Sequence, residues 1–600
     1  MTLALALLAG AGVASLPLTG AAQDAAALYV GPAEGEYNRN KTIASDDADV
    51  EISAALWLPA ESLERYAGCS LSAVHAALVS KLNIDRLDVW VRTDLDGPDL
   101  AGGSSETPSK GWNSVDLSEP LTLSAGQGLY LGYTFHQKNA AMGLSALENP
   151  GHGSLWVKMP GGEWTDRSAE GTLAIEAVLT GSALPRYDLR LDAISPDLYL
   201  VTQRPEYKVS GTVKNIGAAT LGGYDVQVSF PGVGGTYTQR VEAELPYGTS
   251  HDFEVTVLVE PTTSEAADFP VEVTVLPWEG TEHWEADNTL QGTYRIVPYD
   301  MTRRILVEEF TTESCPNCPR VAGYLHEALA KEEFKDAVVP VVHHSAYGTD
   351  RHTSPWDEEF LFFYDRSYIY APSVMIDRTL WGGSECTSNP ASLEGLEQGF
   401  RNRLAVPAQV ALLIEAENTG SEMKVTARGV KGTDTLCENP HIVVVVTEDD
   451  VPAVFQAGAD DPVGYRQEHV TRAMNGAWGE PLTFDGDEYE YSCTLDLDPE
   501  WRTTQGQDPW KAENLNVVAY IFNYAVKDRH ACEVMNAALL PATNILSSAP
   551  LVTDDDASLA SSASTGWYTP TGLYLGTARP TAPGLYLHRT PGATRKHLIP

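Results

Sequence analysis

Positive charge is scarce in this chain of 600 residues. It has 40 Lys and Arg against 82 Asp and Glu, which gives a formal net charge of −42 at pH 7. A nucleic-acid site needs cationic side chains to neutralise phosphates, and so strong a negative charge repels a polyphosphate. We therefore expect no nucleic-acid partner.

Cysteine is also scarce, with seven residues at positions 69, 315, 318, 386, 437, 493 and 532. This number is too small for a scaffold held together by disulfides. Only Cys315 and Cys318 are close in sequence. In an oxidising compartment the four cysteines from 386 to 532 allow three pairings and leave Cys69 odd, and the sequence does not choose among them.

Long hydrophobic runs are missing after residue 22, whereas a membrane-spanning helix needs about 20 apolar residues. Residues 2–22 are apolar and small, and Ala21-Ala22-Gln23 suits signal peptidase. No Lys or Arg precedes Arg39, so the usual cationic start of such a segment is missing. Pro17 and several glycines favour a cleaved export signal over a membrane anchor, and the lack of a nearby cysteine excludes lipidation. We predict a signal peptide at 1–23 and export.

The length exceeds that of a single domain, which usually holds about 50 to 250 residues. Up to residue 299 the pattern is that of strands with one buried face. Apolar side chains occur at every second residue in Leu129, Leu131, Tyr133 and Phe135, and the same alternation returns around Val226. Two β-sandwiches are therefore predicted.

From residue 300 the pattern becomes strand–helix alternation, typical of an α/β domain. Ile305-Leu306-Val307 predicts a strand buried on both faces, and the stripe from Val321 to Leu329 predicts an amphipathic helix. Further helices are predicted from Ser354 to Tyr364 and from Asn389 to Leu404. Strands return after Pro407.

The sharpest chemical signal is Cys315-Pro316-Asn317-Cys318, directly after the buried strand and at the start of the helix. Free N–H groups and the positive end of the helix dipole stabilise a thiolate there. Pro316 suits the first helical turn. Two intervening residues let Cys318 reach Cys315, so a small disulfide can form and break.

The segment over about residues 300–405 resembles the thioredoxin-like superfamily. The resemblance lies in the CPNC residues together with Val307-Glu308-Glu309-Phe310 and Ala371-Pro372-Ser373-Val374. The resemblance implies that Cys315 attacks, Cys318 resolves, Glu309 takes the proton of the resolving thiol, and Pro372 is a cis-proline whose backbone docks extended substrate. Glu308, Glu309 and Glu313 oppose thiolate formation while Arg320 favours it. We expect a less oxidising pair than the strongest oxidants, whose potentials lie near about −120 mV.

Two narrower resemblances concern the family and its export. The strand–CxxC–helix segment, Val341-Val342-His343-His344 and the following β domain resemble the Omp28-related surface and outer-membrane proteins. Gly584-Leu585-Tyr586-Leu587 and Arg595-Lys596-His597 resemble the C-terminal sorting domain of the type IX secretion system. Lys214-Asn215-Ile216-Gly217 resembles a turn of cell-adhesion-related immunoglobulin-like modules, which implies a spacer or binder.

Several alternatives remain open. The CxxC pair could be a static disulfide, or half of a zinc site with His343, His344 and His352, which lack ligand spacing. Glu309 could be an exposed strand residue if Glu308 points inward. Two further candidates are a calcium loop at Asp94, Asp96 and Asp99, for which a hairpin turn is preferred, and a glycan platform at Trp112, Trp156 and Trp164, for which core packing is preferred.

The predicted architecture is multidomain, in this order: signal peptide 1–23, jelly-roll-like β-sandwich 28–184, immunoglobulin-like β-sandwich 185–299, thioredoxin-like α/β domain 300–406, β-rich Omp28-type domain 407–541, linker 542–566 and a short β sorting tail 567–600. The predicted function is thiol–disulfide exchange on extracytoplasmic proteins by an exported, surface-attached or secreted protein. The alternative is a surface binding or adhesin-like protein with a structural disulfide. Expected partners are protein thiols or disulfides, the type IX secretion machinery, and a surface glycan or protein ligand, with no cofactor and no metal.

Overall fold

The structure is a computed structural model. It describes residues 24–547, apart from 141–143, 148–153, 203–205, 264–266, 346–347, 365–367, 382, 384 and 435, and then residues 566–568, 574–576, 578–580, 584–590 and 593–599. The predicted signal peptide and most of the predicted linker lie outside the described residues.

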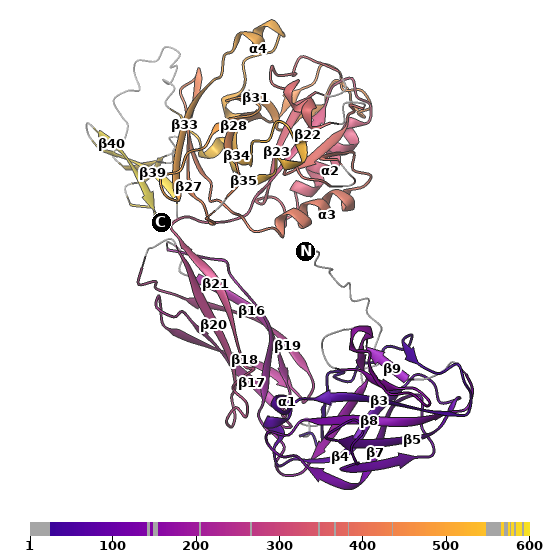
Figure 1. The fold of residues 1–600 in the computed structure, drawn as a ribbon. Helices are drawn as coiled ribbons and strands as arrows, with labels where there is room; N and C mark the ends of the chain where they lie inside the picture. The colour runs from indigo at the N-terminus through magenta and orange to yellow at the C-terminus, as the bar shows by residue number, and fades with distance from the viewer. Residues whose placement is uncertain are drawn as a thin grey trace. The chain divides into compact units, whose positions relative to one another are not determined.

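The chain is multidomain and rich in strands, as predicted. It forms two compact units (Figure 1). The first unit comprises residues 24–198, 206–263 and 268–294. The second comprises residues 199–202, residue 267, residues 295–547 and the described part of the C-terminal segment.

The first unit contains four sheets. Two of them pack against each other as the first sandwich. One runs β1 (Leu28–Val30), β13 (Ile175–Thr180), β4 (Ser70–Leu78), β9 (Leu144–Leu147) and β12 (Thr172–Leu173), with β2 (Thr42–Ile43) on β9 and β7 (Gly111–Thr122) on β4. The other runs β11 (Trp164–Asp166), β10 (Trp156–Lys158), β3 (Val50–Leu58), β8 (Leu129–Gln137), β5 (Ile84–Arg92) and β6 (Ala101–Ser105). Leu131, Tyr133 and Phe135 are fully buried between them, as their alternation predicts.

The other two sheets of this unit form the second sandwich. One runs β14 (Leu189–Pro196), β16 (Glu206–Asn215) and β19 (Ser250–Leu258). The other runs β15 (Tyr199–Val201), β21 (Thr289–Val297), β20 (Asp268–Pro277), β17 (Leu221–Ser229) and β18 (Thr236–Leu245), of which β15 and the end of β21 belong to the second unit.

The second unit is built on a large sheet. Its order is β25 (Thr387–Ser388), β24 (Ser373–Ile376), β22 (Ile305–Thr311), β23 (Val338–His344), β31 (Val470–Met474), β28 (Pro440–Glu448), β34 (Leu515–Asn523) and β35 (Val534–Leu540), with β32 (Glu480–Pro481) on β28. A small sheet runs β33 (Glu488–Asp496), β27 (Glu422–Val430), β26 (Leu413–Asn418) and β36 (Leu546–Ser547). Two further sheets are the pair β29 (Val451–Pro452) and β30 (Arg466–Gln467), and β38 (Tyr574–Gly576), β37 (Gly566–Tyr568), β39 (Gly584–Thr590) and β40 (Ala593–Ile599).

The described helices are short. The α-helices are α1 (Ala60–Leu63), α2 (Cys318–Leu329), α3 (Leu393–Leu404) and α4 (Glu500–Thr504), and the 3₁₀ helices are η1 (Glu64–Tyr66), η2 (Ser168–Glu170), η3 (Glu359–Phe363), η4 (Ala512–Asn514), η5 (Arg529–Ala531) and η6 (Ala542–Asn544). In the described part of the chain, no helix has the length and apolar character needed to span a membrane.

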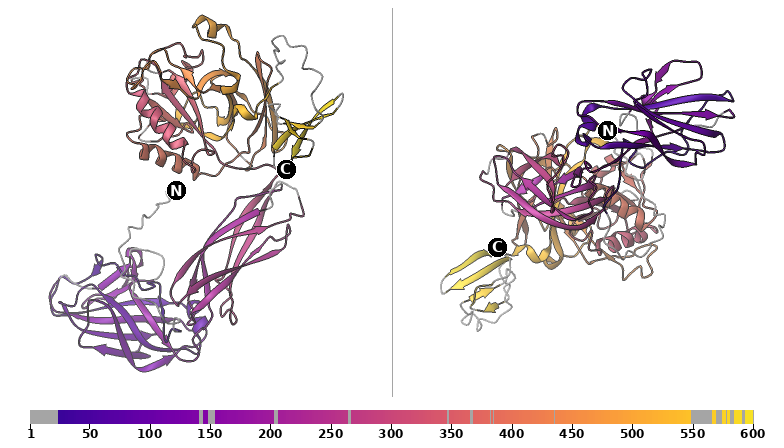
Figure 2. Two further views of the ribbon diagram at one scale, coloured as in Figure 1. Left: turned by 180° about the vertical axis from the view of Figure 1, so that it is seen from behind. Right: turned by 90° about the horizontal axis from the view of Figure 1, so that it is seen from below.

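Two faces of the large sheet organise the second unit. Ile305 and Val307 lie on its helix face, where α2 and α3 pack side by side over β22 and β24 (Figures 1 and 2). Farther along the same face, β28 and β34 pack against the small sheet. Leu306 and Phe310 lie on the opposite, aromatic face, beneath η3. Both faces of β22 are therefore buried, as its apolar run predicts.

The large sheet crosses the predicted boundary between residues 406 and 407. β23, from the predicted α/β domain, pairs in parallel with β31, from the predicted β-rich domain, through Val342 and Val470. At the other end, β36 pairs with β26 through Leu546 and Glu417, so the fold extends to Ser547 rather than stopping at 541. Residues 300–547 thus form one continuous structure.

The helix predicted from Ser354 to Tyr364 is wrong in extent. A turn at Ser354 precedes η3, which covers only Glu359–Phe363. The backbone N–H of Ser354 donates to Asp357, and the other oxygen of that carboxylate lies 3.1 Å from His343 on the aromatic face. Asp357 thus ties the segment to the sheet, and only Glu359–Phe363 wind into a helix, of the 3₁₀ type.

A buried ion pair anchors the aromatic face. Arg378 and Glu308 are 0% and 1% exposed, and the guanidinium donates to both carboxylate oxygens at 2.9 Å. It also donates to the hydroxyl of Tyr520 at 2.6 Å. Burial alone would raise the pKa of Glu308, but the Arg378 charge lowers it to about 2. The carboxylate therefore stays ionised inside the core.

We expect Arg378→Leu to lower the free energy of unfolding of the second unit by about 3–5 kcal/mol, because it leaves the buried Glu308 carboxylate without its cation. Urea unfolding of the full chain measures this change. Arg428→Leu is the matched control, since Arg428 pairs with Glu490 at the surface and should change the free energy by less than about 1 kcal/mol. Equal losses in the two variants would contradict the role of the buried pair.

Candidate active site

The Cys315–Cys318 disulfide lies between the end of β22 and the start of α2. The two Cα atoms are 5.5 Å apart. The N–H of Cys315 donates to the carbonyl of Thr312, and the N–H of Cys318 to that of Cys315. We name residues 315–318 the CPNC turn. The helix begins at Cys318, so Pro319, rather than Pro316 as predicted, occupies its first turn.

Both cysteines are covered. Cys315 and Cys318 are each 1% exposed, whereas Pro316 and Asn317 between them are exposed. Exchange with another protein needs an approach to the sulfur of Cys315. The structure therefore shows a disulfide at the molecular surface whose cysteines do not themselves reach solvent.

Glu309 lies on the helix face of β22, six residues before Cys315. It is 2% exposed, and within the described part of the chain its Oε1 atom has no hydrogen-bond partner. Burial raises its pKa to about 8, because an ionised carboxylate is poorly solvated there. At neutral pH this carboxyl holds a proton that it can give up or take back.

The neighbouring Glu308 points to the aromatic face, into its pair with Arg378. The alternation of β22 thus separates the two carboxyls onto opposite faces, both buried. Glu308 and Glu309 therefore both point into the interior, on opposite sides of the sheet. Only Glu309 shares its face with α2.

Pro372 is brought to the same strand end. The Ala371–Pro372 bond is cis, and β24 pairs with β22 so that Ser373 stands opposite Phe310. Pro372 therefore lies next to the segment that leads from β22 into the CPNC turn. The three elements that the resemblance picks out, Glu309, the CPNC turn and Pro372, meet at one end of the sheet.

A cavity of about 750 Å³ adjoins this end of the sheet. Glu309, Pro316 and Asn317 line one part of it, and α2 contributes Arg320 and His326. The remaining wall comes from residues 458–469, which precede β31. Tyr465 lies in this wall, so it lines the same cavity as Glu309, and burial raises its pKa to about 12.

The other charges near the turn are held by partners. Arg320 donates to the carbonyl of Pro390 and to Asn389, ahead of α3. Glu313 accepts from the N–H of Val454 at 2.9 Å and lies 3.3 Å from His352. The predicted crowding of carboxylates around Cys315 is thus relieved by partners on both faces.

Of the histidines of the zinc alternative, His343 lies in one network, and His344 and His352 lie together in another. His343 contacts Asp357 on the aromatic face, while His344 contacts Asp350. His352 packs against His344 with ring centroids 5.0 Å apart. Among the described residues, no three His, Cys, Asp or Glu side chains are arranged to hold a metal ion.

The remaining cysteines are free thiols in this structure. Cys386 and Cys532 are fully buried, and Cys437 and Cys493 are partly buried. Burial raises the pKa of the Cys437 and Cys493 thiols to about 11. A thiol with such a pKa is a poor nucleophile at neutral pH.

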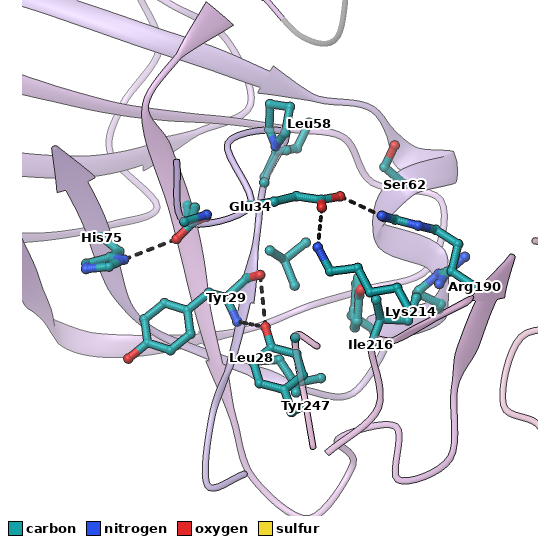
Figure 3. A pocket seen from close by; sticks show the side chains of 18 of the residues that line it. Leu28, Tyr29, Glu34, Leu58, Ser62, His75, Arg190, Lys214, Ile216 and Tyr247 are labelled. Carbon is teal, nitrogen blue, oxygen red and sulfur yellow. Dashed lines mark hydrogen bonds and ion pairs between the residues drawn. The ribbon is translucent and has the colours of Figure 1, made fainter. Parts of the chain in front are cut away.

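A second cavity, of about 760 Å³, lies in the first unit (Figure 3). Glu34 extends into it and pairs with Arg190 and Lys214 from the second sandwich. Burial acts to raise the pKa of Glu34, but these two cations lower it to about 2. The charged groups drawn in Figure 3 thus bind one another and join the two sandwiches.

The tryptophans of the glycan alternative do not form one platform. Trp112 lies in β7, where it stacks on His75 and lines the second cavity. Trp156 and Trp164 lie on β10 and β11 in the other sheet. Two of the three aspartates of the calcium alternative are in ion pairs, Asp96 with Lys158 and Asp99 with Arg92, and Asp94 accepts from the N–H of Asp96.

Sequence reasoning missed the segment that covers the CPNC turn. Residues 451–467, formed by β29, β30 and the loop between them, contact the turn from 140 residues away in sequence. Their sequence carries no helix or strand periodicity. Gly458, Pro462 and Gly464 indicate a loop, and in the structure Gly458 adopts a positive φ of 77°.

No model of a known protein family and no curated protein matches the sequence. Solved structures similar to this one include HBP35 of Porphyromonas gingivalis, at 15% identity over 50% of this chain and 100% of that chain, with a TM-score of 0.34. Others are a domain of the outer membrane lipoprotein Omp28 from the same organism (20% identity, 23% and 90% covered, TM-score 0.15) and the CARDB domain of the PF1109 protein from Pyrococcus furiosus, in complex with di-metal ions (14% identity, 18% and 94% covered, TM-score 0.14).

The raised pKa of Glu309 predicts a pH-dependent stability. Between the usual value of 4.5 and the folded value of about 8, the unfolded chain loses this proton and the folded chain keeps it. The folded state therefore loses stability as the pH rises through this window. Glutamine does not titrate. Between pH 5 and pH 8 the free energy of unfolding of Glu309→Gln should therefore rise, relative to that of the wild type, by on the order of 3 kcal/mol.

Urea unfolding of the full chain at both pH values measures this gain. Glu332→Gln is the control, because that side chain is 88% exposed and should follow the wild type at both pH values. If the free energies of unfolding of Glu309→Gln and the wild type differ by the same amount at pH 5 and at pH 8, Glu309 is ionised in the folded protein.

Proposed function

We propose that the chain is an exported surface protein whose second unit contains a thioredoxin-like module for thiol–disulfide exchange. The observation that carries the proposal is the position of Glu309. A buried carboxyl with a pKa of about 8 lines the same cavity as the CPNC turn, at the end of the same strand. A structural disulfide has no need of a buried acid beside it.

The order of elements supports a thioredoxin-like module. β22, α2 and β23 form a parallel β–α–β unit, and β24, β25 and α3 then complete the sheet on the other side of β22. α2 and α3 cover the same face. In this arrangement the disulfide lies at the carboxyl end of the central strand.

The proposed exchange begins from the disulfide. A client thiolate attacks the sulfur of Cys315, the Cys315–Cys318 bond breaks, and a mixed disulfide forms while Cys318 leaves as a thiolate. A second client thiolate then attacks the client sulfur of the mixed disulfide and releases Cys315. The client gains one disulfide and the turn becomes a dithiol; another protein disulfide, reduced in turn, reoxidises it.

Glu309 serves as the local proton store in this scheme. It gives its proton to the departing Cys318 thiolate and takes a proton back when Cys318 attacks in the reverse direction. A carboxyl with an ordinary pKa would be ionised at neutral pH and have no proton to give. Burial without a charged partner supplies the required pKa.

The exported location is part of the proposal and rests on sequence. Residues 1–23 suit a signal peptide, and residues 567–600 resemble a type IX sorting tail. Outside the cytoplasm, client proteins carry disulfides that an exchange module can form or rearrange.

The second candidate is a surface binding protein in which the CPNC pair is a static disulfide. The 1% exposure of both cysteines favours it, since a staple needs no access. The cavity of the first unit, with Tyr29 and Trp112 among its lining residues, favours a binding role for that unit. The two candidates differ in whether Cys315 reacts with other proteins.

An insulin-reduction assay with dithiothreitol separates them. We expect the wild-type chain to accelerate insulin reduction and Cys315→Ser to fall to the uncatalysed rate, because the attacking sulfur is gone. Cys318→Ser should instead accumulate a mixed disulfide through Cys315, visible as a covalent adduct under non-reducing conditions.

Cys437→Ser is the matched control, since this partly buried thiol lies outside the turn and its loss should leave the rate unchanged. Equal rates in the wild type and Cys315→Ser, with no adduct in Cys318→Ser, would favour the binding protein.

A further inference from the structure

The hairpin of residues 451–467 lies directly on the CPNC turn. Its strands β29 and β30 pair with each other through Val451 and Gln467, and the loop between them reaches the turn. We name it the cover hairpin. It leads straight into β31, which pairs with β23 of the large sheet, so its base is fixed while its tip extends over the disulfide.

The cover hairpin is held by hydrogen bonds to the segment that carries Cys315, one between backbone groups and the others through the side chains of Gln456 and Glu313. The N–H of Ala457 donates to the carbonyl of Glu313 at 2.8 Å. The side-chain amide of Gln456 donates to the carbonyls of Thr312 and Cys315 at 3.3 and 3.2 Å. The N–H of Val454 donates to the Glu313 carboxylate. Each contact has the hairpin as donor and the turn segment as acceptor.

Gly458 brings the two backbones together. A Cβ atom at this position would lie 2.0 Å from the carbonyl oxygen of Pro316, a separation that no side chain can adopt. Its φ of 77° also suits glycine. Any residue other than glycine must therefore push the hairpin away from the turn between the two cysteines.

The outer side of the cover hairpin is weakly attached. Within the described chain, β29 and β30 form a sheet of their own rather than joining the large sheet. Val454, Phe455 and Val463 are 56%, 57% and 68% exposed. A segment with few buried apolar side chains and its own small sheet opens at lower free energy than the core does.

The acceptors under the hairpin suit an extended polypeptide. The carbonyl of Glu313 accepts from a backbone N–H of the hairpin, and those of Thr312 and Cys315 accept from the amide of Gln456; backbone N–H donors of this kind are provided by every peptide segment. We propose that the cover hairpin occupies the position of an extended polypeptide client on the CPNC turn and must leave it before Cys315 can exchange. This inference rests on the exchange function proposed above and adds its client class and its regulation.

Opening of the cover hairpin would also change the surroundings of the Glu309 carboxyl. Tyr465 of the hairpin and Glu309 line the same cavity, and Gly458 and Gln467 of the hairpin belong to the same wall. Departure of the hairpin would admit water to this carboxyl. The same motion therefore uncovers the sulfur and solvates its proton store.

The rate at which a water-soluble phosphine reduces the disulfide tests the proposal in the full chain. Free thiols at 315 and 318 are alkylated at intervals and counted by mass spectrometry of the CPNC peptide. We expect Gly458→Ala to raise the rate at least about tenfold, because the accessible fraction of the protein rises. Gly486→Ala is the matched control: φ there is 62°, nothing lies within 4 Å of the added Cβ, and the rate should stay at the wild-type value.

Gln456→Ala provides a second variant that keeps the backbone of the hairpin and removes two of its bonds to the turn. It should raise the rate less than Gly458→Ala does, and its far-ultraviolet circular dichroism reports whether the fold is intact. Wild-type rates in both variants would overturn the proposal.

The client class is tested with insulin B chain whose thiols are blocked. In Gly458→Ala this disordered chain should bind the vacated turn and slow reduction by the phosphine, and the absence of any slowing would overturn the polypeptide assignment. The insulin-reduction assay runs in parallel. If the two variants are reduced faster by the phosphine but insulin turnover does not depend on Cys315, the exchange function is rejected and the covering role of the hairpin stands. If insulin turnover depends on Cys315 but the variants are reduced at the wild-type rate, the covering role is rejected and the exchange function stands.

Discussion

One strand pairing determines the chemistry of the second unit. The parallel contact between Val342 of β23 and Val470 of β31, with the N–H of Val342 donating to the carbonyl of His469, joins the CPNC half of the large sheet to the half that follows residue 407. Because the cover hairpin immediately precedes β31, this pairing fixes its base beside the disulfide. The site is therefore made by two stretches of sequence about 140 residues apart, and neither completes it alone.

Adjacent carboxyls on β22 show how position alone sets acidity. Glu308 and Glu309 are both almost fully buried, yet their pKa values move in opposite directions, to about 2 and about 8. Arg378 compensates the first charge, whereas no cation among the described residues pairs with the second carboxyl. The strand thus carries an anion that anchors the aromatic face and a neutral acid that lines the same cavity as the CPNC turn. A charged partner for Glu309 would stabilise the fold and remove its proton at neutral pH.

Much of this arrangement can be predicted from sequence, because it follows local rules. The apolar run of β22 and the stripe of α2 give the strand and the helix, and the CPNC spacing gives the disulfide. Alternation could not tell Glu308 from Glu309, since a strand buried on both faces has no exposed side. The helix expected from Ser354 failed because Asp357 is tied to His343, a long-range contact that periodicity does not record. The cover hairpin was missed for a related reason: its contacts are made by backbone groups, Gln456 and a glycine, which carry no pattern.

The equilibrium of the full chain with glutathione buffers tests most directly whether the CPNC turn is a working couple. The account predicts a reversible two-electron exchange at Cys315 and Cys318, with a midpoint between the strongest oxidants near about −120 mV and the structural disulfides below about −300 mV. A disulfide that stays closed at every glutathione ratio, or that opens only below about −300 mV, would contradict it and leave the pair as a staple.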